Sequence, residues 1–531
     1  MSFLETSKSV AQEFIQSLVF VDDRASFNNN SDEIDLDDME ILEPTTADAI
    51  EALEEDNINK EYEKTTNVFN AKTIIDSFSN HGIVASIIKP EKSLDEKIIT
   101  NVVKLSKVVD VVVLDIDIEN DEGKTAKEIF SQIIIEKPRL KLIVFYSGAG
   151  RATISEFSFE IMQKVKEKNG YKLKDFVYQI EKTRIVILSK EGVGSEGVKF
   201  EDLPEKIFEE FASISQGIIS NAVLKALALI KKNTHQILNN LDVQLDAPFL
   251  SHRAWLPTPN DSENFLLELI SSELFSIVSS NLEVRKHAGI ENICDYLLYK
   301  NSDRSYSLQT NQESPNTVTF DVIKTILTNG LSNKESINNI SSLSRISKNK
   351  LESSYKNFTK TFCFQNENHE ELDHKFSTLT TLNTYINTNN AKMQLTLGTL
   401  VKKGYYDFLV CIQPKCDSVR IRGKQKFIFL KLSVNKTKFD FIILDDESKY
   451  KNLKISNSVS DIVTYEFLPN ELGYITSTNI GGKQSFRGDN KVLFTWIGQL
   501  KDSFAQHIVQ EYASKLSRIG LDPYEWLRRN A

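Results

Sequence analysis

The sequence predicts an α/β fold: a doubly wound, five-stranded parallel sheet, followed by a mainly helical region and a C-terminal α+β domain. Three observations predict this order. Short Val- and Ile-rich runs alternate with longer amphipathic stretches up to about residue 217, helical periodicity dominates residues 218–390, and strand-like alternation begins near residue 391. Buried parallel strands appear as short apolar runs, and helices connect them. We therefore expect three regions, at residues 10–217, 218–390 and 391–531.

Five apolar runs are the expected strands of the first region. They lie at residues 18–21, 83–88, 108–114, 142–145 and 185–188. Segments of helical period separate them, at residues 71–78, 94–105, 125–135, 155–167 and 204–214. Strands joined by crossover helices are parallel, and α/β proteins of this type bind ligands beyond the carboxyl ends of the strands. A ligand site is therefore expected at that edge of the sheet.

The remaining regions carry weaker patterns. Helical stretches are expected at residues 218–241 and 264–298, whereas the Ser- and Asn-rich segment 301–350 predicts no definite element. Strand-like alternation covers residues 393–468. The tail at residues 492–529 has apolar residues at helical spacing and predicts a C-terminal helix.

Charge is concentrated in one segment. The 531 residues include 64 Lys and Arg and 74 Asp and Glu, a net charge of −10. Residues 31–64 contain 14 acidic residues and two lysines, so this segment alone carries −12 and the rest of the chain is nearly neutral. We interpret residues 28–66 as an acidic insertion after the first strand. A near-neutral remainder argues against nucleic acid as a partner.

Two further features concern location. No uninterrupted apolar run approaches the length of about 20 residues that a membrane-spanning helix needs. The N-terminus also lacks a basic segment followed by an apolar one. The sequence thus predicts a cytoplasmic protein without a membrane partner.

Polar side chains follow four of the five expected strands. Asp22 and Asp23 follow the first strand, Asp115 the third, Ser147 the fourth and Lys190 the fifth. Three crowded carboxylates repel one another unless a cation lies among them, and an all-oxygen site suits Mg²⁺. A lysine and a hydroxyl nearby can neutralise and bind the oxygens of a transferred phosphoryl group. The pattern predicts phosphoryl chemistry at this edge.

These residues stand in four motifs, VFVDD at 19–23, VVVLDIDI at 111–118, LIVFYSG at 142–148 and VILSK at 186–190. Together they resemble the receiver domain of two-component response regulators, over roughly residues 18–217. The resemblance implies a flavodoxin-like fold in which Asp115 accepts a phosphoryl group from a phosphohistidine of a histidine kinase. It also implies site roles: Mg²⁺ held by Asp22, Asp23, Asp115 and the main-chain carbonyl of Asp117, with Ser147 and Lys190 contacting the transferred group.

Some positions depart from the receiver pattern. Ile187 stands where receivers usually carry an aromatic residue, and Glu191 stands where a proline usually follows the lysine. Glu119 also replaces a common proline, whereas Gly123 matches a usual glycine. The resemblance therefore implies conserved phosphorylation chemistry with an altered output switch.

Residues 218–531 show no nucleophile–base pair, metal motif or phosphate loop, so no separate catalytic domain is recognised. Long receiver proteins of this kind resemble members of phage-defence phosphorelays of the Detocs type. That resemblance implies a phosphate-buffering role beside a second receiver–effector protein, and a homodimer is also possible.

Two alternatives remain open. The basic strand at residues 415–431, with aromatic residues between its cations, could make the C-terminal domain a phosphorylation-controlled effector that binds nucleic acid or a nucleotide. The chain could also be a pseudo-receiver scaffold whose carboxylates serve folding.

Overall fold

The computed structural model describes residues 2–26, 69–135, 139–190, 197–308, 316–363, 367–383 and 392–516, except positions 405, 436, 446, 448 and 457. The chain forms two compact units, Met1–Arg304 and Ser305–Ala531. Each is described by itself. The predicted acidic insertion 28–66 lies outside the described residues. Its flanks are paired, because the short strands β2 (Ala25–Ser26) and β3 (Phe69–Asn70) run parallel.

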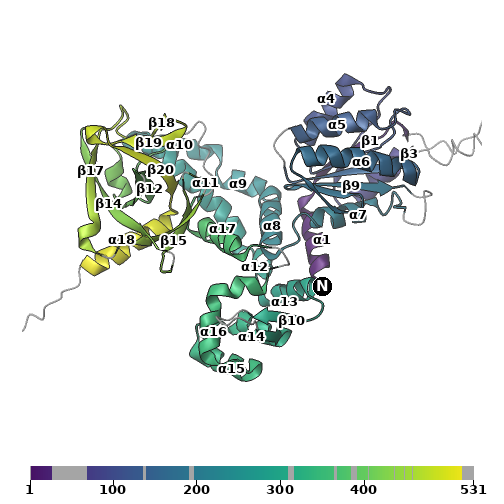
Figure 1. Ribbon diagram of the computed structural model, residues 1–531. Helices are drawn as coiled ribbons and strands as arrows, with labels where there is room; N and C mark the ends of the chain where they lie inside the picture. The colour runs from purple at the N-terminus through teal and green to yellow at the C-terminus, as the bar shows by residue number, and fades with distance from the viewer. Residues whose placement is uncertain are drawn as a thin grey trace, which may run out of the picture. The chain divides into compact units, whose positions relative to one another are not determined.

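A seven-stranded sheet is the centre of the first unit (Figure 1). Its order is β4-β1-β5-β6-β9-β8-β7. The first five strands in this order are parallel, whereas β8 and β7 are antiparallel. The strands are β1 (Ser17–Val21), β4 (Val84–Ile88), β5 (Val111–Leu114), β6 (Lys141–Ser147), β7 (Tyr171–Lys174), β8 (Val177–Ile180) and β9 (Thr183–Ser189).

The predicted count of five strands is therefore wrong, although the doubly wound parallel arrangement is confirmed. The two additional strands form a hairpin between α6 and β9, and β8 pairs with β9 over Val177↔Val186 to Ile180↔Thr183. The hairpin turn contains Phe176 at φ 61° and no glycine. Because Gly or Asn in a tight turn is the main sequence signal of a hairpin, this one carries little signal.

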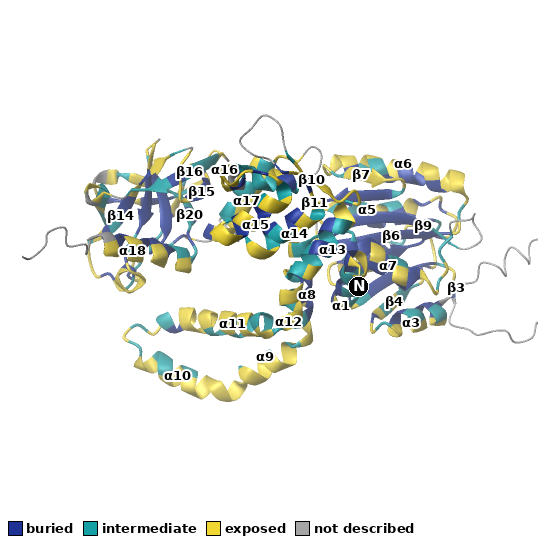
Figure 2. Cartoon of the chain, turned by 90° about the horizontal axis from the view of Figure 1, so that it is seen from below, coloured by how far each residue is buried: buried dark blue, intermediate teal, exposed yellow. Residues whose placement is uncertain are grey.

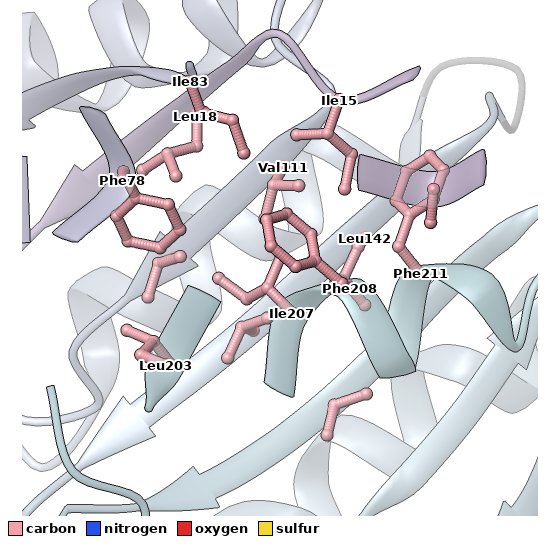
Figure 3. Close-up of a cluster of buried hydrophobic side chains, with 14 of the residues drawn as sticks. Ile15, Leu18, Phe78, Ile83, Val111, Leu142, Leu203, Ile207, Phe208 and Phe211 are labelled. Carbon is pink, nitrogen blue, oxygen red and sulfur yellow. The ribbon is translucent and has the colours of Figure 1, made fainter. Parts of the chain in front are cut away.

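Helices cover both faces of the sheet. Side chains of α1, α3, α7 and α8 pack on one face, in a core that includes Phe78 and Phe208 (Figure 3). Side chains of α4, α5 and α6 form the second core on the other face. The bounds are α1 (Phe3–Phe14), α3 (Ala71–Ser79), α4 (Glu96–Ser106), α5 (Lys124–Ile135), α6 (Arg151–Glu167), α7 (Leu203–Ala212) and α8 (Ile218–Lys232).

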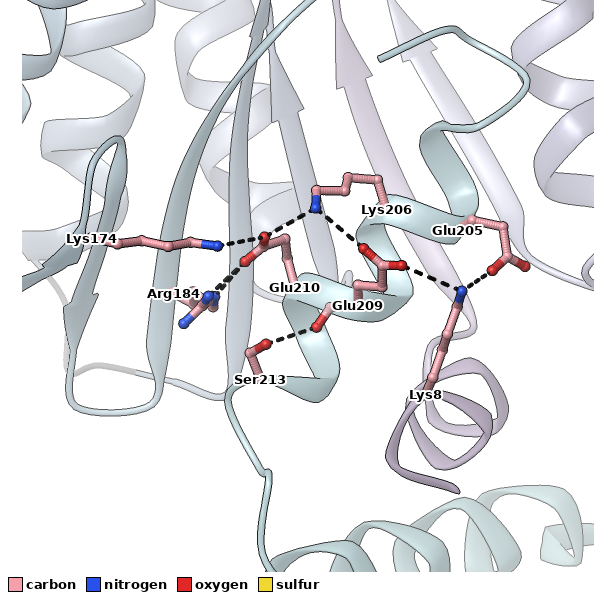
Figure 4. Close-up of polar contacts among 8 residues, drawn as sticks. All are labelled: Lys8, Lys174, Arg184, Glu205, Lys206, Glu209, Glu210 and Ser213. Carbon is pink, nitrogen blue, oxygen red and sulfur yellow. Dashed lines mark hydrogen bonds and ion pairs between the residues drawn. The ribbon is translucent and has the colours of Figure 1, made fainter. Parts of the chain in front are cut away.

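Ion pairs attach α7 to its neighbours (Figure 4). The buried Glu210 accepts two hydrogen bonds from Arg184 of β9, at 2.9 Å from Nε and 2.6 Å from Nη2. Lys8 of α1 forms ion pairs with Glu205 and Glu209 at the exposed side of α7. Consequently α7 is tied both to the last parallel strand and to the N-terminal helix.

Further helices follow α8 within the first unit. They are α9 (Thr234–Asn240), α10 (Asp246–Trp255), α11 (Asp261–Ser280), α12 (Leu282–Lys286) and α13 (Ile290–Lys300), with a 3₁₀ turn at Val243–Leu245. The helix expected at 218–241 is thus interrupted at Asn233, which caps α8 and begins α9. Within the described part of the chain, no helix has the length and apolar character required to cross a membrane.

The second unit is β-rich. An antiparallel pair of strands, β10 (Ser305–Leu308) and β11 (Asn316–Thr319), precedes a helical segment. That segment comprises α14 (Phe320–Asn329), α15 (Lys334–Ser344), α16 (Lys348–Ser354), a 3₁₀ helix (Tyr355–Thr361) and α17 (His369–Thr381).

A nine-stranded antiparallel sheet follows, in the order β15-β16-β14-β13-β12-β20-β19-β18, with β17 also paired to β14. Its strands are β12 (Thr399–Lys403), β13 (Asp407–Cys411), β14 (Gln425–Val434), β15 (Phe441–Leu444), β16 (Tyr450–Ile455), β17 (Ile462–Phe467), β18 (Thr478–Ile480), β19 (Lys483–Arg487) and β20 (Leu493–Gln499).

The predicted helix over 492–529 is wrong at its start. Residues Leu493–Gln499 form β20, which pairs with β12 and β19, and helix α18 begins only at Asp502 and runs to Leu516. The aromatic and β-branched composition of LFTWI favours a strand when pairing partners are present on both sides. Residues 517–529 of the predicted helix lie outside the described residues.

Candidate phosphoacceptor site

The carboxyl ends of four parallel strands bring the predicted site residues together. Asp115 follows β5, and its amide donates to the carbonyl of Val21 in β1 at 2.8 Å. Lys190 follows β9, and its amide donates to the carbonyl of Ser147, the last residue of β6, at 2.8 Å. Main-chain bonds between neighbouring strands thus hold these positions at one edge of the sheet.

Lys190 lies between two of the carboxylates. Its Nζ is 2.8 Å from Asp22 Oδ2 and 2.7 Å from Asp115 Oδ2. The side chain of Asp22 is fully buried and that of Asp115 is 6% exposed, against 14% for Lys190. A buried carboxylate needs a partner, and here one ammonium group serves two of them.

A third carboxylate completes an acidic cluster. Oxygens of Asp22, Asp23 and Asp115 lie within 4.8 Å of one another. Asp23 Oδ2 accepts a hydrogen bond from the Glu119 amide at 2.9 Å, whereas the buried Asp23 Oδ1 has no hydrogen-bond partner among the described residues. Hard divalent cations bind to carboxylate oxygens, and this cluster includes a buried oxygen that is left without a hydrogen-bond partner in the described part of the chain. These residues therefore fit a metal.

Burial also changes the protonation of the cluster. Burial raises the pKa of Asp115 to about 6, against the opposing attraction of Lys190. Burial disfavours the charged form of Lys190, but the carboxylates of Asp115 and Asp22 outweigh it and raise the pKa of this lysine. The negative charge of the cluster is thus incompletely balanced by Lys190, which favours uptake of a further cation.

Ser147 and Asp117 flank the acidic cluster. The buried Ser147 hydroxyl accepts from the Ala149 amide at 3.1 Å, so its own hydrogen can be donated. The Asp117 amide lies 3.4 Å from Asp115 Oδ1, and its main-chain carbonyl stays a predicted metal ligand. All the site residues predicted from the sequence therefore lie at this edge.

The loop after Asp117 explains two sequence features. Glu119 and Gly123 both have positive φ, 54° and 81°. A Cβ atom at Gly123 would lie 2.8 Å from the Phe157 side chain, so a larger residue would need both strain and displacement. Glu119, where receivers often have proline, donates its amide to Asp23, which a proline could not do.

Tyr146 is a neighbour of the site that the sequence analysis missed. Its ring lies 5.6 Å from Lys190 Nζ, and its hydroxyl donates to the Val198 carbonyl at 2.6 Å. Val198 in turn bridges to Lys190 in a parallel β-bridge. An aromatic residue directly before Ser147, combined with Ile187 at the usual aromatic position, was the available signal. Glu191 lies outside the described residues.

The basic strand of the second unit does not resemble a base-stacking surface. Phe427 and Phe429 are fully buried in a core of that unit. Lys415 pairs with Asp502 at 2.6 Å, and Lys424 Nζ lies 3.1 Å from Asp489. Proteins that bind single-stranded nucleic acid present exposed aromatic rings within a cationic groove. These contacts weaken the nucleic-acid alternative.

Comparison with known proteins relates part of the chain to a family. No curated protein and no solved structure matches the chain. Residues 14–195 match the family model of the response receiver domain. This span contains the four parallel strand ends that carry Asp22, Asp23, Asp115, Ser147 and Lys190. The match and the geometry of these strand ends together support a receiver domain in this part of the chain, which indicates the phosphoacceptor function of response regulators.

Proposed function

We propose that this chain is a response regulator whose Asp115 accepts a phosphoryl group from a phosphohistidine of a histidine kinase. The observation that carries the proposal is the contact of Lys190 Nζ with both Asp22 and Asp115, beside the orphaned oxygen of Asp23. Phosphoryl transfer depends mostly on positioning and on neutralising charge. A rim with one lysine, three carboxylates and a hydroxyl supplies both.

In the proposed reaction, a carboxylate oxygen of Asp115 attacks phosphorus. The P–N bond to histidine breaks, the imidazole nitrogen keeps the electron pair and takes up a proton, and an aspartyl phosphate forms. Lys190 contacts the carboxylate before transfer and is positioned to pair with phosphoryl oxygens afterwards. The Ser147 hydroxyl is a donor for a second oxygen.

Asp22, Asp23, Asp115 and the main-chain carbonyl of Asp117 are the proposed ligands of Mg²⁺. The bound ion would neutralise charge on the oxygens of the phosphoryl group. Main-chain hydrogen bonds orient two of these carboxylates, since Asp22 Oδ1 accepts the Arg24 amide at 2.9 Å and Asp23 Oδ2 accepts the Glu119 amide.

The test is phosphotransfer to the full chain. A phosphorylated histidine kinase encoded beside its gene is incubated with the protein and Mg²⁺. We expect an acid-stable, hydroxylamine-labile label on the wild type and none on Asp115→Asn. Asp175→Asn is the matched control, because this exposed carboxylate lies in the β7–β8 turn and pairs with an exposed lysine, Lys172. Equal labelling of Asp115→Asn and wild type would refute the assignment.

The finer proposal is that the chain buffers phosphoryl groups in an antiviral phosphorelay. Its support is the resemblance of the sequence to receiver proteins of such relays. If it holds, adding the wild-type chain to the kinase and a second receiver–effector protein lowers the label on that protein, and Asp115→Asn does not. An unchanged label on the second receiver would contradict buffering while leaving phosphoryl acceptance by Asp115 intact.

A further inference from the structure

Residues 234–280, called the arm below, form a helical hairpin with little buried surface (Figure 2). Helices α9 and α10 run one way and α11 returns beside them. Asn240 of α9 donates to Glu273 of α11 at 3.2 Å, and the rings of His252 in α10 and Phe265 in α11 lie 4.7 Å apart. Arg253 closes the turn through Ser262 at 2.8 Å.

The arm exposes large apolar side chains along its whole length. Helices α9 and α10 bury no residue, and α11 buries Ser262 alone, although all three helices are fully described. Six side chains are between 61% and 89% exposed: Leu238, Val243, Leu250, Trp255, Leu267 and Phe275. Helix α11 has apolar residues on all sides, a pattern typical of helices that are surrounded by other helices.

The exposed apolar area is that of an interface. At about 100–200 Å² per large apolar side chain, the exposed parts of these six residues and of Leu245, Phe265 and Leu266 together present on the order of 800 Å². The largest apolar patch of an ordinary monomer is about 300–600 Å². A standard interface buries about 800 Å² on each partner. The arm therefore offers the area that one side of a stable dimer needs.

We propose that the arm of a second copy of this chain packs on the arm, so that two helical hairpins form a four-helix dimer interface. A hairpin of two antiparallel helical layers is half of a four-helix bundle, and twofold symmetry supplies the other half from an identical surface. Such pairing surrounds α11, whose exposed Leu267 and Phe275 lie on the same helix two turns apart. The interface goes beyond the proposed phosphoryl chemistry and does not depend on it.

The charge of the arm gives a way to distinguish a second copy of the chain from a basic partner. The arm contains six acidic residues and a single arginine, so two arms repel one another and a basic partner would be attracted. Salt screens both effects. Association of two copies through apolar contact is therefore expected to be as strong or stronger at high salt, whereas binding of a basic partner weakens.

The first experiment measures the mass of the full chain in solution by light scattering at micromolar concentration. We expect twice 60.4 kDa for the wild type, at low and high salt. Leu267→Glu combined with Phe275→Glu should raise the dissociation constant at least about tenfold. Val108→Glu is the control, because this side chain is 74% exposed but lies outside the arm. A monomeric wild type, or an unchanged dimer in the double variant, would overturn the proposal.

A second measurement does not depend on charged substitutions. In a Cys416→Ser background, which removes the exposed native thiol, Leu267→Cys should give a dimer with a short bismaleimide and Val108→Cys should not. Absence of the cross-linked dimer from Leu267→Cys, or equal cross-linking at Val108→Cys, contradicts an arm-to-arm interface. Phosphotransfer to each variant reports separately on the receiver, so failure of the dimer proposal is distinguishable from failure of the proposed function.

Discussion

Replacing Lys190 by methionine tests the charge balance of the candidate site. Methionine keeps the aliphatic length of the side chain but removes the ammonium group that lies 2.8 Å from Asp22 and 2.7 Å from Asp115. Both carboxylates are almost fully buried, and removing one partner of a buried pair costs about 3–5 kcal/mol. Protonation of Asp115 limits the loss, because burial already raises its pKa. We therefore expect the free energy of unfolding to fall by about 3 kcal/mol, the lower end of that range, in Mg²⁺-free buffer.

Hydrogen exchange of the full chain measures this loss locally. Amides in β1 and β5 lie in the core and should exchange through global opening of the first unit. A loss of 3 kcal/mol accelerates their exchange by about 100-fold or more. Lys172→Met is the matched control: its partner Asp175 is 85% exposed, so that pair is worth less than about 1 kcal/mol. Acceleration below about tenfold in Lys190→Met, or equal to that of the control, would refute the reasoning.

Three further outcomes are expected. Burial lowers the pKa of Lys141 to about 8, so the unfolded chain binds more protons between about pH 8 and 10.5. The free energy of unfolding should therefore rise by up to about 3 kcal/mol across that window in wild type but not in Lys141→Met, measured by urea titration at each pH. Tyr146→Phe should lose about 1 kcal/mol through its bond to the Val198 carbonyl, measured as faster exchange of the Val198 amide. In a thermal-shift assay, added Mg²⁺ should raise the melting temperature of wild type and of Asp175→Asn. The increase in the melting temperature of Asp23→Asn should be at most half as large.

The parallel part of the first sheet was predictable because four of its five strands, β1, β5, β6 and β9, are buried on both faces, and β4 is more exposed. Runs such as residues 142–145 are uniformly apolar, and amphipathic helices separate them at regular intervals. The β7–β8 hairpin follows neither pattern. Every residue of β7 is exposed, and β8 acquires its buried position by pairing with β9 and packing against α6. Its order therefore comes from a tertiary contact that local sequence does not encode.

Strand β20, which the sequence analysis assigned to a helix, shows the same limit of local sequence patterns. Residues 493–499 are compatible with a helical apolar face when considered alone. In the structure, Trp496 pairs with Val401 of β12, and Phe494 packs against Phe429 with ring centroids 6.2 Å apart. Pairing and packing partners that lie about 65 to 100 residues earlier in the chain determine the conformation of this segment. A local hydrophobic period therefore cannot predict it.

The site itself was predictable to the level of residues but not of contacts. The carboxyl ends of parallel strands lie at one edge of the sheet whatever residues follow them, so the positions of Asp22, Asp115, Ser147 and Lys190 must share that edge. That Lys190 joins Asp22 to Asp115, and that Tyr146 holds the chain after Lys190 through Val198, depends on side-chain directions that no spacing specifies.

The carboxylate cluster of the first sheet and the exposed lysines of β14 differ in what they indicate about function. At the edge of the first sheet, three carboxylates lie within 4.8 Å of one another, although their mutual repulsion opposes folding. A fold tolerates such crowding when a cation or a bound group offsets it, so the cluster indicates chemistry. In β14, by contrast, Phe427 and Phe429 enter one core and Leu430 and Leu432 enter another, while Lys426 and Lys431 are exposed. This arrangement follows from the packing of apolar residues on a strand, and it needs no ligand to explain it. The costly arrangement, and not the number of charged residues, therefore distinguishes the candidate site from the basic strand.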